Sequence, residues 1–424
     1  MKRIFGFLVI GILLLVTIPI AYGLDFPDLS GHEITVYYMA GTTYEPAARK
    51  AAPEFEELTG CKVRVVADPY ATLFEKQLTS LITRSQAYDV LQVAYQWDGL
   101  FMPYLEPLNS FIDSYGIDMN LFIPGVLKNC GGGFDKIYGI PNACDVYSFI
   151  YRTDIFEGAG LKPPTNWSEV NEIAAKLTTD EIYGSVLAGL GEQVGQFWRA
   201  RYLTLGGKFL NEEWQPQLTN NREHGLEAAR LLKDLIAYCP EGTLSYGYPE
   251  QMQAFILGRA AMAEVWPSFL RAPAGDKKES SIVGKWAFAP YPGGSGELSA
   301  WSLGIPNTSK NKDAAFAWIA FFTQESKQRD FFLELGIGPT LSSVYEDKDF
   351  LATRPDLEGI LPGLMNPVPR FNVAQSQEAY DFMDARVSAF LADMISAEQM
   401  ITEIQEKWEG LFSVDTPDFP YTGF

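Results

Sequence analysis

Short runs of β-branched and aromatic residues alternate along the chain with longer segments in which apolar residues recur every three or four positions. Glu33–Met39, Lys62–Val66 and Asp89–Val93 have the composition of β-strands. Between them, apolar residues at helical spacing over 48–58 and 74–82 predict two helices. This β-α-β-α-β order predicts a parallel sheet with helices on both faces.

The ligands of such sheets bind beyond the carboxyl ends of the strands. The loops Gly41–Glu45 and Ala94–Asp98 follow the first and the third predicted strand. These two loops are therefore the first candidates for a binding site.

A second alternating region begins near Tyr147. Asn166 has the position of a helix N-cap, and Glu169 can reach back to it in a capping-box arrangement. Further helices are predicted near 194–205, 223–238, 313–323 and 379–412, with Met383, Val387, Phe390 and Met394 in register on the last. Phe255–Glu264 is predicted to run from a helix end into a strand, and short strands are predicted near 286–290 and 302–306. No internal repeat and no low-complexity linker separates the two regions, which predicts two α/β lobes that exchange strands more than once.

The N-terminus has the three parts of a secretory signal. Lys2 and Arg3 precede an apolar run from Ile4 to about Ile20, and the small residues of 21–23 suit a leader peptidase. Cleavage after about Gly23 leaves an exported, soluble, periplasmic protein. The alternative is retention of residues 1–23 as a membrane anchor. A lipid anchor is not expected, because the first cysteine of the chain is Cys61.

Composition narrows the class of protein. The 424 residues are 47% hydrophobic, which is ample for a buried core, and their formal charge of -20 repels nucleic acid and anionic membranes. Only two histidines are present, His32 and His224, which argues against a histidine-built metal site or catalytic triad. No catalytic motif or phosphate-binding loop is found, although the many acidic residues leave a glycosidase open as an alternative.

The four cysteines do not have the spacing of a zinc or redox site. Cys130 and Cys144 flank a run of three glycines, and an oxidising compartment would allow a disulfide between them. Whether that bond forms is left open. Cys61 and Cys239 are expected to be free and buried in different lobes.

Several segments, in their order and spacing, resemble the extracellular solute-binding proteins of the maltose-binding type, which serve ABC importers. The segments that carry the resemblance are Phe55–Val63, Tyr138–Pro141, Ser148–Asp154, Pro163–Val170, Ala254–Met262, Ala289–Pro292 and Gly304–Lys312. The resemblance covers nearly the whole chain after the leader.

The resemblance implies a fold of two Rossmann-like α/β lobes, the type II periplasmic binding protein fold, with a hinge of crossing segments. The crossings would fall near Asn142–Ser148, Tyr291–Trp301 and Gly338–Ser342. The expected N-terminal lobe comprises residues 24–142 and 300–338, and the expected C-terminal lobe comprises 143–299 and 339–424. Such a protein closes around its ligand by hinge bending.

The function that the resemblance implies is the capture of a small carbohydrate and its delivery to the permease of an ABC importer. The protein would then be a monomeric binding protein without enzymatic activity, cofactor, metal or nucleic-acid partner. The solute itself stays open between a sugar, an oligosaccharide and a sugar alcohol.

A cleft for a neutral polyol needs aromatic faces against the C–H faces of the solute and polar groups for its hydroxyls. The resemblance places Asp145 where the maltose type has a sugar-contacting acid; the alternative is a hinge carboxylate bonded to backbone amides. The remaining candidates come from the loops and crossings that should face the cleft, and they are Thr43, Tyr44, Tyr95, Gln96, Trp97, Phe197, Trp198, Trp266, Trp301, Arg370 and Phe371.

Alternatives accompany several of these candidates. Trp97, Phe197 and Trp198 could instead be core packing, and Tyr44 could simply begin a helix. A ligand other than a sugar, such as ferric iron or a polyamine, also stays open because tyrosines cluster at Tyr37, Tyr38 and Tyr44. Tyr37 and Tyr38 are neighbours in a predicted strand and would point to opposite faces.

Overall fold

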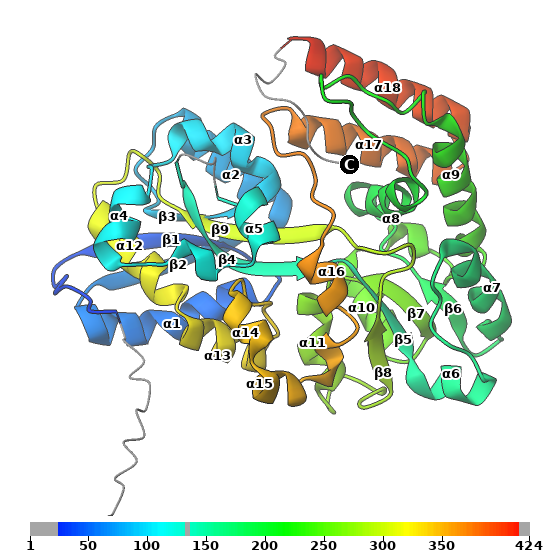
Figure 1. Ribbon diagram of the computed structural model, residues 1–424, viewed down its shortest axis with the longest axis horizontal. Helices are drawn as coiled ribbons and strands as arrows, with labels where there is room; N and C mark the ends of the chain where they lie inside the picture. The colour runs from blue at the N-terminus through cyan, green and yellow to red at the C-terminus, as the bar shows by residue number, and fades with distance from the viewer. Residues whose placement is uncertain (1–23, 132–135, 415–424) are drawn as a thin grey trace, which may run out of the picture.

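Two β-sheets, each covered by helices, organise the molecule and lie side by side (Figure 1). A computed structural model of the chain describes residues 24–131 and 136–414. The predicted signal peptide, residues 1–23, and most of the glycine run after Cys130 lie outside the described residues. The expected two-lobed α/β fold is confirmed.

The first sheet has the strand order β2-β1-β3-β9-β4. Its strands are β1 (Glu33–Met39), β2 (Lys62–Asp68), β3 (Val90–Ala94), β4 (Gly139–Val146) and β9 (Leu298–Gly304). The first three are parallel, as the alternating pattern predicts. β9 returns from late in the sequence and pairs antiparallel with both β3 and β4, so the complete sheet is mixed.

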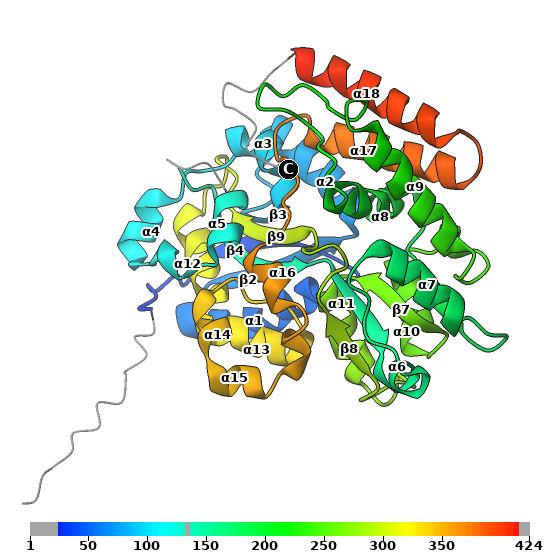
Figure 2. The same ribbon diagram turned by 45° about the vertical axis from the view of Figure 1, so that its right-hand side comes forward.

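The second sheet has the order β6-β7-β5-β8. Its strands are β5 (Ser148–Arg152), β6 (Tyr183–Val186), β7 (Ala260–Val265) and β8 (Trp286–Ala289). β6 and β7 are parallel, whereas β5 pairs antiparallel with β7 and β8. Figure 2 shows this sheet beside α11 and α7, with its strands running in a different direction from β4 and β9 of the first sheet.

Helices cover both sheets. Those of the first half are α1 (Tyr44–Thr59), α2 (Tyr70–Ile82), α3 (Asp98–Phe101), α4 (Asn109–Tyr115), α5 (Pro124–Asn129), α6 (Thr153–Ala159), α7 (Trp167–Leu177) and α8 (Gly191–Thr204). Those of the second half are α9 (Arg222–Ile236), α10 (Tyr248–Ile256), α11 (Pro267–Gly275), α12 (Lys312–Phe322), α13 (Glu325–Leu335), α14 (Ser342–Glu346), α15 (Lys348–Ala352), α16 (Leu361–Met365), α17 (Ser376–Leu391) and α18 (Ala397–Val414). Short 3-10 turns include Tyr95–Trp97 directly after β3.

Local sequence explains where helices begin and end. The Asn166 side chain accepts a hydrogen bond from the Glu169 amide at the start of α7, which is the predicted N-cap. The Glu169 carboxylate reaches back to the amide of Thr165 and not to that of the cap residue. α1 ends at Gly60, whose φ of 77° is the left-handed conformation that glycine adopts most easily.

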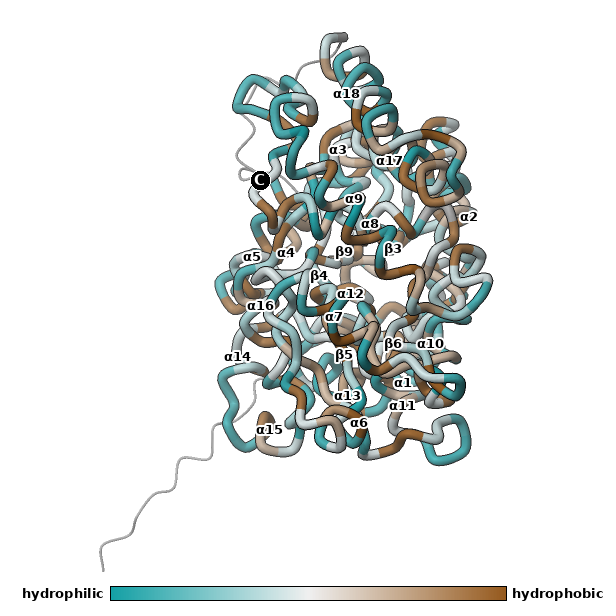
Figure 3. The backbone as a smooth tube through the Cα atoms, turned by 90° about the vertical axis from the view of Figure 1, so that its right-hand side faces the viewer, coloured by the Kyte–Doolittle hydropathy of each residue, from teal (hydrophilic) through white to brown (hydrophobic). Residues whose placement is uncertain are grey.

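Two hydrophobic clusters form the core. The larger one surrounds the first sheet and extends to one face of the second; within it every residue from Ala314 to Phe322 on α12 is buried. The smaller one lies under α8, α9, α17 and α18. α18 alternates hydrophilic and hydrophobic segments along its length, as expected for a helix with one buried face (Figure 3).

The chain passes from one sheet to the other through crossing segments that lie close together. It leaves β4 for β5 through Tyr147 and returns from β8 to β9 through 290–297. A Cβ built on Gly296 would lie 1.8 Å from the Tyr147 carbonyl oxygen, and one built on Gly338 would lie 1.9 Å from that of Cys144. Only glycine allows the crossing segments to approach one another this closely.

The third predicted crossing is less simple. Residues 338–340 run beside β4, where Gly338 accepts a hydrogen bond from the Cys144 amide. The chain then stays with the larger cluster until Leu364 and enters the smaller one at Phe371. The lobe boundary that we place between residues 338 and 339 stays a prediction.

Other details answer a question that the sequence left open or differ from what the sequence predicts. All four cysteines are free and buried, so the optional Cys130–Cys144 disulfide is absent. The Cys144 thiol instead donates to the carbonyl oxygen of Pro339. Met394 is 75% exposed and follows the end of α17, so the helical register of Met383 and Val387 does not extend to it. Among the described residues, no helix has the length and apolarity needed to cross a membrane.

We predict that Gly296→Ala lowers the free energy of unfolding by more than about 2 kcal/mol, because the new methyl group would meet a backbone carbonyl that cannot rotate away. Gly158→Ala is the control: Gly158 lies in α6, and no atom is within 4 Å of the place that an alanine Cβ would take, so this substitution should leave stability unchanged or raise it slightly. Chemical denaturation measures both. Equal effects of the two substitutions would contradict this account of the crossing.

Candidate functional site

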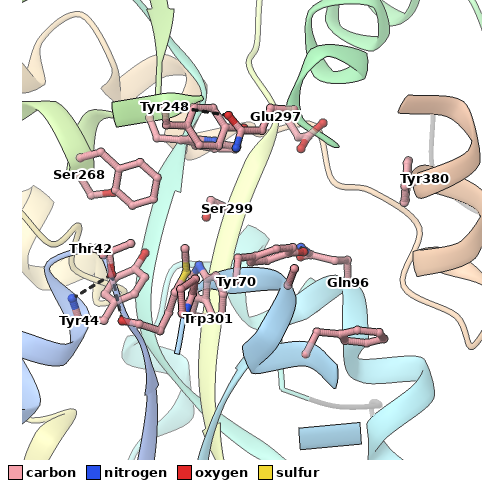
Figure 4. Close-up of a pocket in the computed structure, with 18 of the residues that line it drawn as sticks. Thr42, Tyr44, Tyr70, Gln96, Tyr248, Ser268, Glu297, Ser299, Trp301 and Tyr380 are labelled. Carbon is pink, nitrogen blue, oxygen red and sulfur yellow. Dashed lines mark hydrogen bonds between the residues drawn. The ribbon is translucent and has the colours of Figure 1, made fainter. Parts of the chain in front are cut away.

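A cleft of about 950 Å³ lies between the two sheets. Figure 4 shows β9 running along its floor, with Ser299 in the middle, Tyr44, Tyr70 and Trp301 on one side and Tyr248, Ser268 and Glu297 on the other. Tyr380 of α17 faces the same space from a third direction. The cleft therefore collects side chains from segments that lie far apart in the sequence.

The wall on the side of the first sheet is built at the carboxyl ends of three parallel strands. Tyr44 follows β1, Tyr70 follows β2, and Tyr95 and Gln96 follow β3. This is the edge at which open α/β sheets place their ligands. Thr42 and Thr43 line the same wall, and the Gln96 amide donates to the Tyr70 hydroxyl at 2.7 Å.

Trp301 of β9 joins these aromatic residues into one surface. Its ring centroid lies 5.6 Å from that of Tyr44 and 6.1 Å from that of Tyr70. These are the centroid separations at which aromatic rings pack favourably on one another. Trp301 is among the residues that line the cleft.

The wall on the side of the second sheet is shorter. Trp266 follows β7 as the N-cap residue of α11 and packs on Tyr147 with 4.8 Å between ring centroids. Ser268 and Phe269 begin α11, and Tyr248 begins α10 with its hydroxyl donating to Gln196 at 2.9 Å. Aromatic faces thus line the cleft from both sides.

Glu297 is the central charged group of the cleft. Its two carboxylate oxygens each accept one hydrogen bond at 2.5 Å, from Nε of Arg199 and Nε of Arg370. Burial alone would raise the pKa of Glu297, but the two guanidinium groups outweigh burial and hold the pKa below its ordinary value. Arg370 is also among the residues that line the cleft, and its backbone amide donates to the Tyr95 hydroxyl.

The structure corrects the expected orientation of Asp145. Its Oδ2 accepts hydrogen bonds from the amide and the hydroxyl of Ser268 at 2.6 and 2.5 Å, its Oδ1 accepts from the Val146 amide, and Arg271 lies 3.9 Å away. Asp145 therefore stands behind Ser268, outside the lining of the cleft. This is the alternative of a hinge carboxylate that bonds backbone amides.

Several other candidates also lie outside the lining. Trp97 is 1% exposed, packs among Tyr70, Phe74 and Phe101, and donates its indole N–H to Gln377. Phe197 and Trp198 are fully buried in the smaller cluster, where Trp198 stacks on Tyr202. Phe371 is likewise buried and stacks on Tyr380. The alternative of core packing describes all of these residues.

Sequence reasoning missed several lining residues. Tyr70 could have been found, because it follows the second parallel strand and the rule of strand ends applies there too. Tyr248, Glu297 and Asp384 carried no local signal, since they line the cleft beside residues that lie far away in the sequence. Asp384 lies on α17 beside core residues such as Met383. From the sequence alone it looks like a polar residue at the edge of the buried face of this helix.

Neither iron binding by the clustered tyrosines nor a metal site is supported by the geometry. The Tyr37 hydroxyl donates to Asp68, and the Tyr38 hydroxyl accepts from Trp318; both rings are fully buried. Within residues 24–131 and 136–414, no group of three histidine, cysteine or acidic side chains could hold a metal ion. Of the three tyrosines, only Tyr44 lines the cleft.

The class of protein follows from comparison with known sequences. The sequence profile of the bacterial extracellular solute-binding proteins matches residues 40–329, which is more than half of the chain. The chain therefore belongs to this family, in agreement with the resemblance found in the sequence. Relatives to which it is similar are named as binding proteins of ABC transporters.

Individual relatives are distant, and one of them aligns over nearly its full length. A probable amino-acid ABC transporter periplasmic-binding protein of Sinorhizobium fredii is 26% identical and aligns over 90% of this chain and 89% of its own. A mannitol-binding protein of Pseudomonas aeruginosa is 27% identical over 60% of each chain.

Solved structures share the fold. The maltose-bound MalE3 protein of T. maritima is 26% identical, with a TM-score of 0.83 over 89% of this chain and 99% of its own. A ribitol complex from Agrobacterium radiobacter, at 24% identity, has a TM-score of 0.83 over 91% of this chain and all of its own. The latter shows the fold alone.

We predict that Glu297→Gln destabilises the protein by about 3 kcal/mol or more, because it leaves two guanidinium groups buried without their shared carboxylate. Glu403→Gln, which breaks the more exposed pair with Arg386, should cost below about 1 kcal/mol. Since the native pKa of Glu297 is depressed, its contribution is present above the ordinary carboxyl pKa and is lost as the pH falls through the native one. Denaturation at neutral and acidic pH measures this; a mild effect of Glu297→Gln would contradict it.

Proposed function

We propose that the protein captures a small polyhydroxylated solute, a sugar or a sugar alcohol, in the cleft between its sheets and delivers it to the permease of an ABC importer. The observation that carries the proposal is the lining of the cleft: aromatic faces on both walls, with hydroxyl, amide and carboxylate groups between them. Aromatic rings suit the C–H faces of such a solute, and the polar groups suit its hydroxyls.

The relatives support the same class of ligand. The T. maritima structure holds maltose, and the Pseudomonas aeruginosa relative is named for mannitol. The Sinorhizobium fredii relative is named for amino acids, which makes an amino-acid ligand the competing class. The breadth of the aromatic lining, from Tyr44 and Tyr70 to Tyr248 and Trp266, favours the polyol over a small amino acid.

Capture would proceed by hinge bending at the crossing segments, as in other two-lobed binding proteins. The candidate ligand contacts are the predicted residues that line the cleft: Thr43, Tyr44, Tyr95, Gln96, Trp266, Trp301 and Arg370. Asp145 would act indirectly, by fixing Ser268 at the start of α11.

We further infer that the protein works in the periplasm after cleavage near Gly23, as a monomer, and without catalytic activity. Glu297, the most central acid of the cleft, is occupied by two arginines and is poorly placed to donate or accept a proton.

Titration with a panel of sugars, sugar alcohols and amino acids tests the proposal. We expect a saturable change in tryptophan emission and a higher melting temperature with at least one sugar or sugar alcohol, and no chemical turnover of it. Release of reducing ends would show a glycosidase instead. A response to amino acids, ferric iron or polyamines alone would overturn the polyol proposal.

Trp266→Ala should weaken binding of the active solute more than about tenfold, because it removes one aromatic face of the cleft. Trp286→Ala is the matched control: Trp286 is also half-buried, but it lies on β8 outside the lining. Isothermal titration calorimetry on both variants gives the dissociation constants. If Trp266→Ala binds as well as Trp286→Ala, the cleft is not the binding site.

A further inference from the structure

Among the described residues, the cleft is lined by more acidic than basic side chains. Glu75, Glu297, Asp381 and Asp384 contribute carboxylates to the lining, whereas Arg370 contributes a guanidinium. Arg199 adds a second positive charge directly behind the lining, where it is 1% exposed. A neutral polyol would not offset this excess of acidic over basic side chains.

The two arginines are directed mainly to Glu297. Each donates its Nε–H to one oxygen of that carboxylate at 2.5 Å. Both guanidinium groups also lie 5.1 Å from the centre of the Tyr380 ring. Glu297 is therefore the hydrogen-bonded partner of both arginines, while Nη1 of Arg199, which has no hydrogen bond, lies nearest to Asp384.

Asp384 is left without a comparable partner. It is 7% exposed and lines the cleft, and its Oδ1 has no hydrogen bond. The nearest cation, the Nη1 atom of Arg199, is 3.7 Å away, too far for a hydrogen bond. Gly195 of α8 makes room for this carboxylate, since a Cβ there would lie 1.8 Å from Oδ1. A buried carboxylate in this condition is costly.

The pKa of Asp384 reflects that cost. Burial raises the pKa of Asp384 to about 7, with Arg199 and Arg370 acting in the opposite direction and Asp381 and Glu297 adding to the rise. A positive group from the solute would stabilise the ionised form. The formal charge of -20 on the whole chain also favours the approach of a cation.

We propose that the solute carries a protonated amino group in addition to its hydroxyls, as an amino sugar or an amino-polyol does, and that Asp384 binds this ammonium group. The proposal rests on the proposed function and narrows its class of substrate. The aromatic lining suits such a solute as well, because ring faces attract cations.

Two pairs of probes that differ by one group test the inference: D-glucitol with 1-amino-1-deoxy-D-glucitol, and D-glucose with D-glucosamine. In calorimetric titrations at pH 7 we expect the aminated member of at least one pair to bind about tenfold tighter than the hydroxyl member, which corresponds to about 1.4 kcal/mol. Asp384→Asn should reduce this preference to about twofold or less. Glu378→Gln, an exposed acid of the same helix paired with Lys407, should leave the preference intact.

The pH dependence of this preference distinguishes an effect of the ammonium charge from an effect of the shape of the solute. The preference within the glucitol pair should grow from about pH 6 to about pH 8 as Asp384 ionises in the presence of Arg199, Arg370, Glu297 and Asp381. In Asp384→Asn this growth should disappear, and the melting temperature of the variant shows that it is folded.

Several outcomes would overturn the inference. Equal or weaker binding of both aminated probes does so, as does a preference that survives in Asp384→Asn. If neither pair binds while a neutral sugar of the panel does, the ammonium inference fails and the proposed function stands. If no sugar, sugar alcohol or aminated probe binds saturably, the proposed function fails and the inference with it.

Discussion

The buried carboxylate of Glu297 holds together parts of the chain that the sequence keeps far apart. Arg199 comes from α8 of the second lobe, and Arg370 comes from the segment that leads into α17. The backbone beside Glu297 pairs with Val368, so two crossing segments meet at the same place. A buried charge that is shared in this way is expensive to break, which fixes the floor of the cleft where the lobes join.

The cleft then follows from two simple constraints. The parallel strands of the first sheet present their carboxyl ends to it, and the loops after them supply Tyr44, Tyr70 and Tyr95. The second lobe contributes residues at the starts of α10 and α11, which face those loops because the chain crosses between the sheets at Tyr147 and Gly296. Close backbone contact between Tyr147 and Gly296 holds the crossing segments side by side, so the two walls face one another across the cleft.

The sequence alone predicted most of the fold and only part of the site. Strands such as Glu33–Met39 and the cap at Asn166 were correct because their signals are local. Trp97 and Trp198 were assigned to the site, yet the structure buries them, since an aromatic residue on a helix reads alike whether it faces a cleft or a core. Glu297 could not be predicted, because its ion pairs join arginines that lie far away in the sequence. Asp384 could not be predicted either, because α17 borders the cleft only once it has packed against α8.

The proposed function requires a solute to lie between the two sheets. A crystal structure of the protein with the tightest solute of the titration panel tests this. We expect the solute to contact Trp301 or Tyr70 on one wall and Trp266 or Tyr248 on the other, with polar bonds near Ser299. A solute bound elsewhere, or one in contact with a single wall after the lobes have closed, would contradict the account.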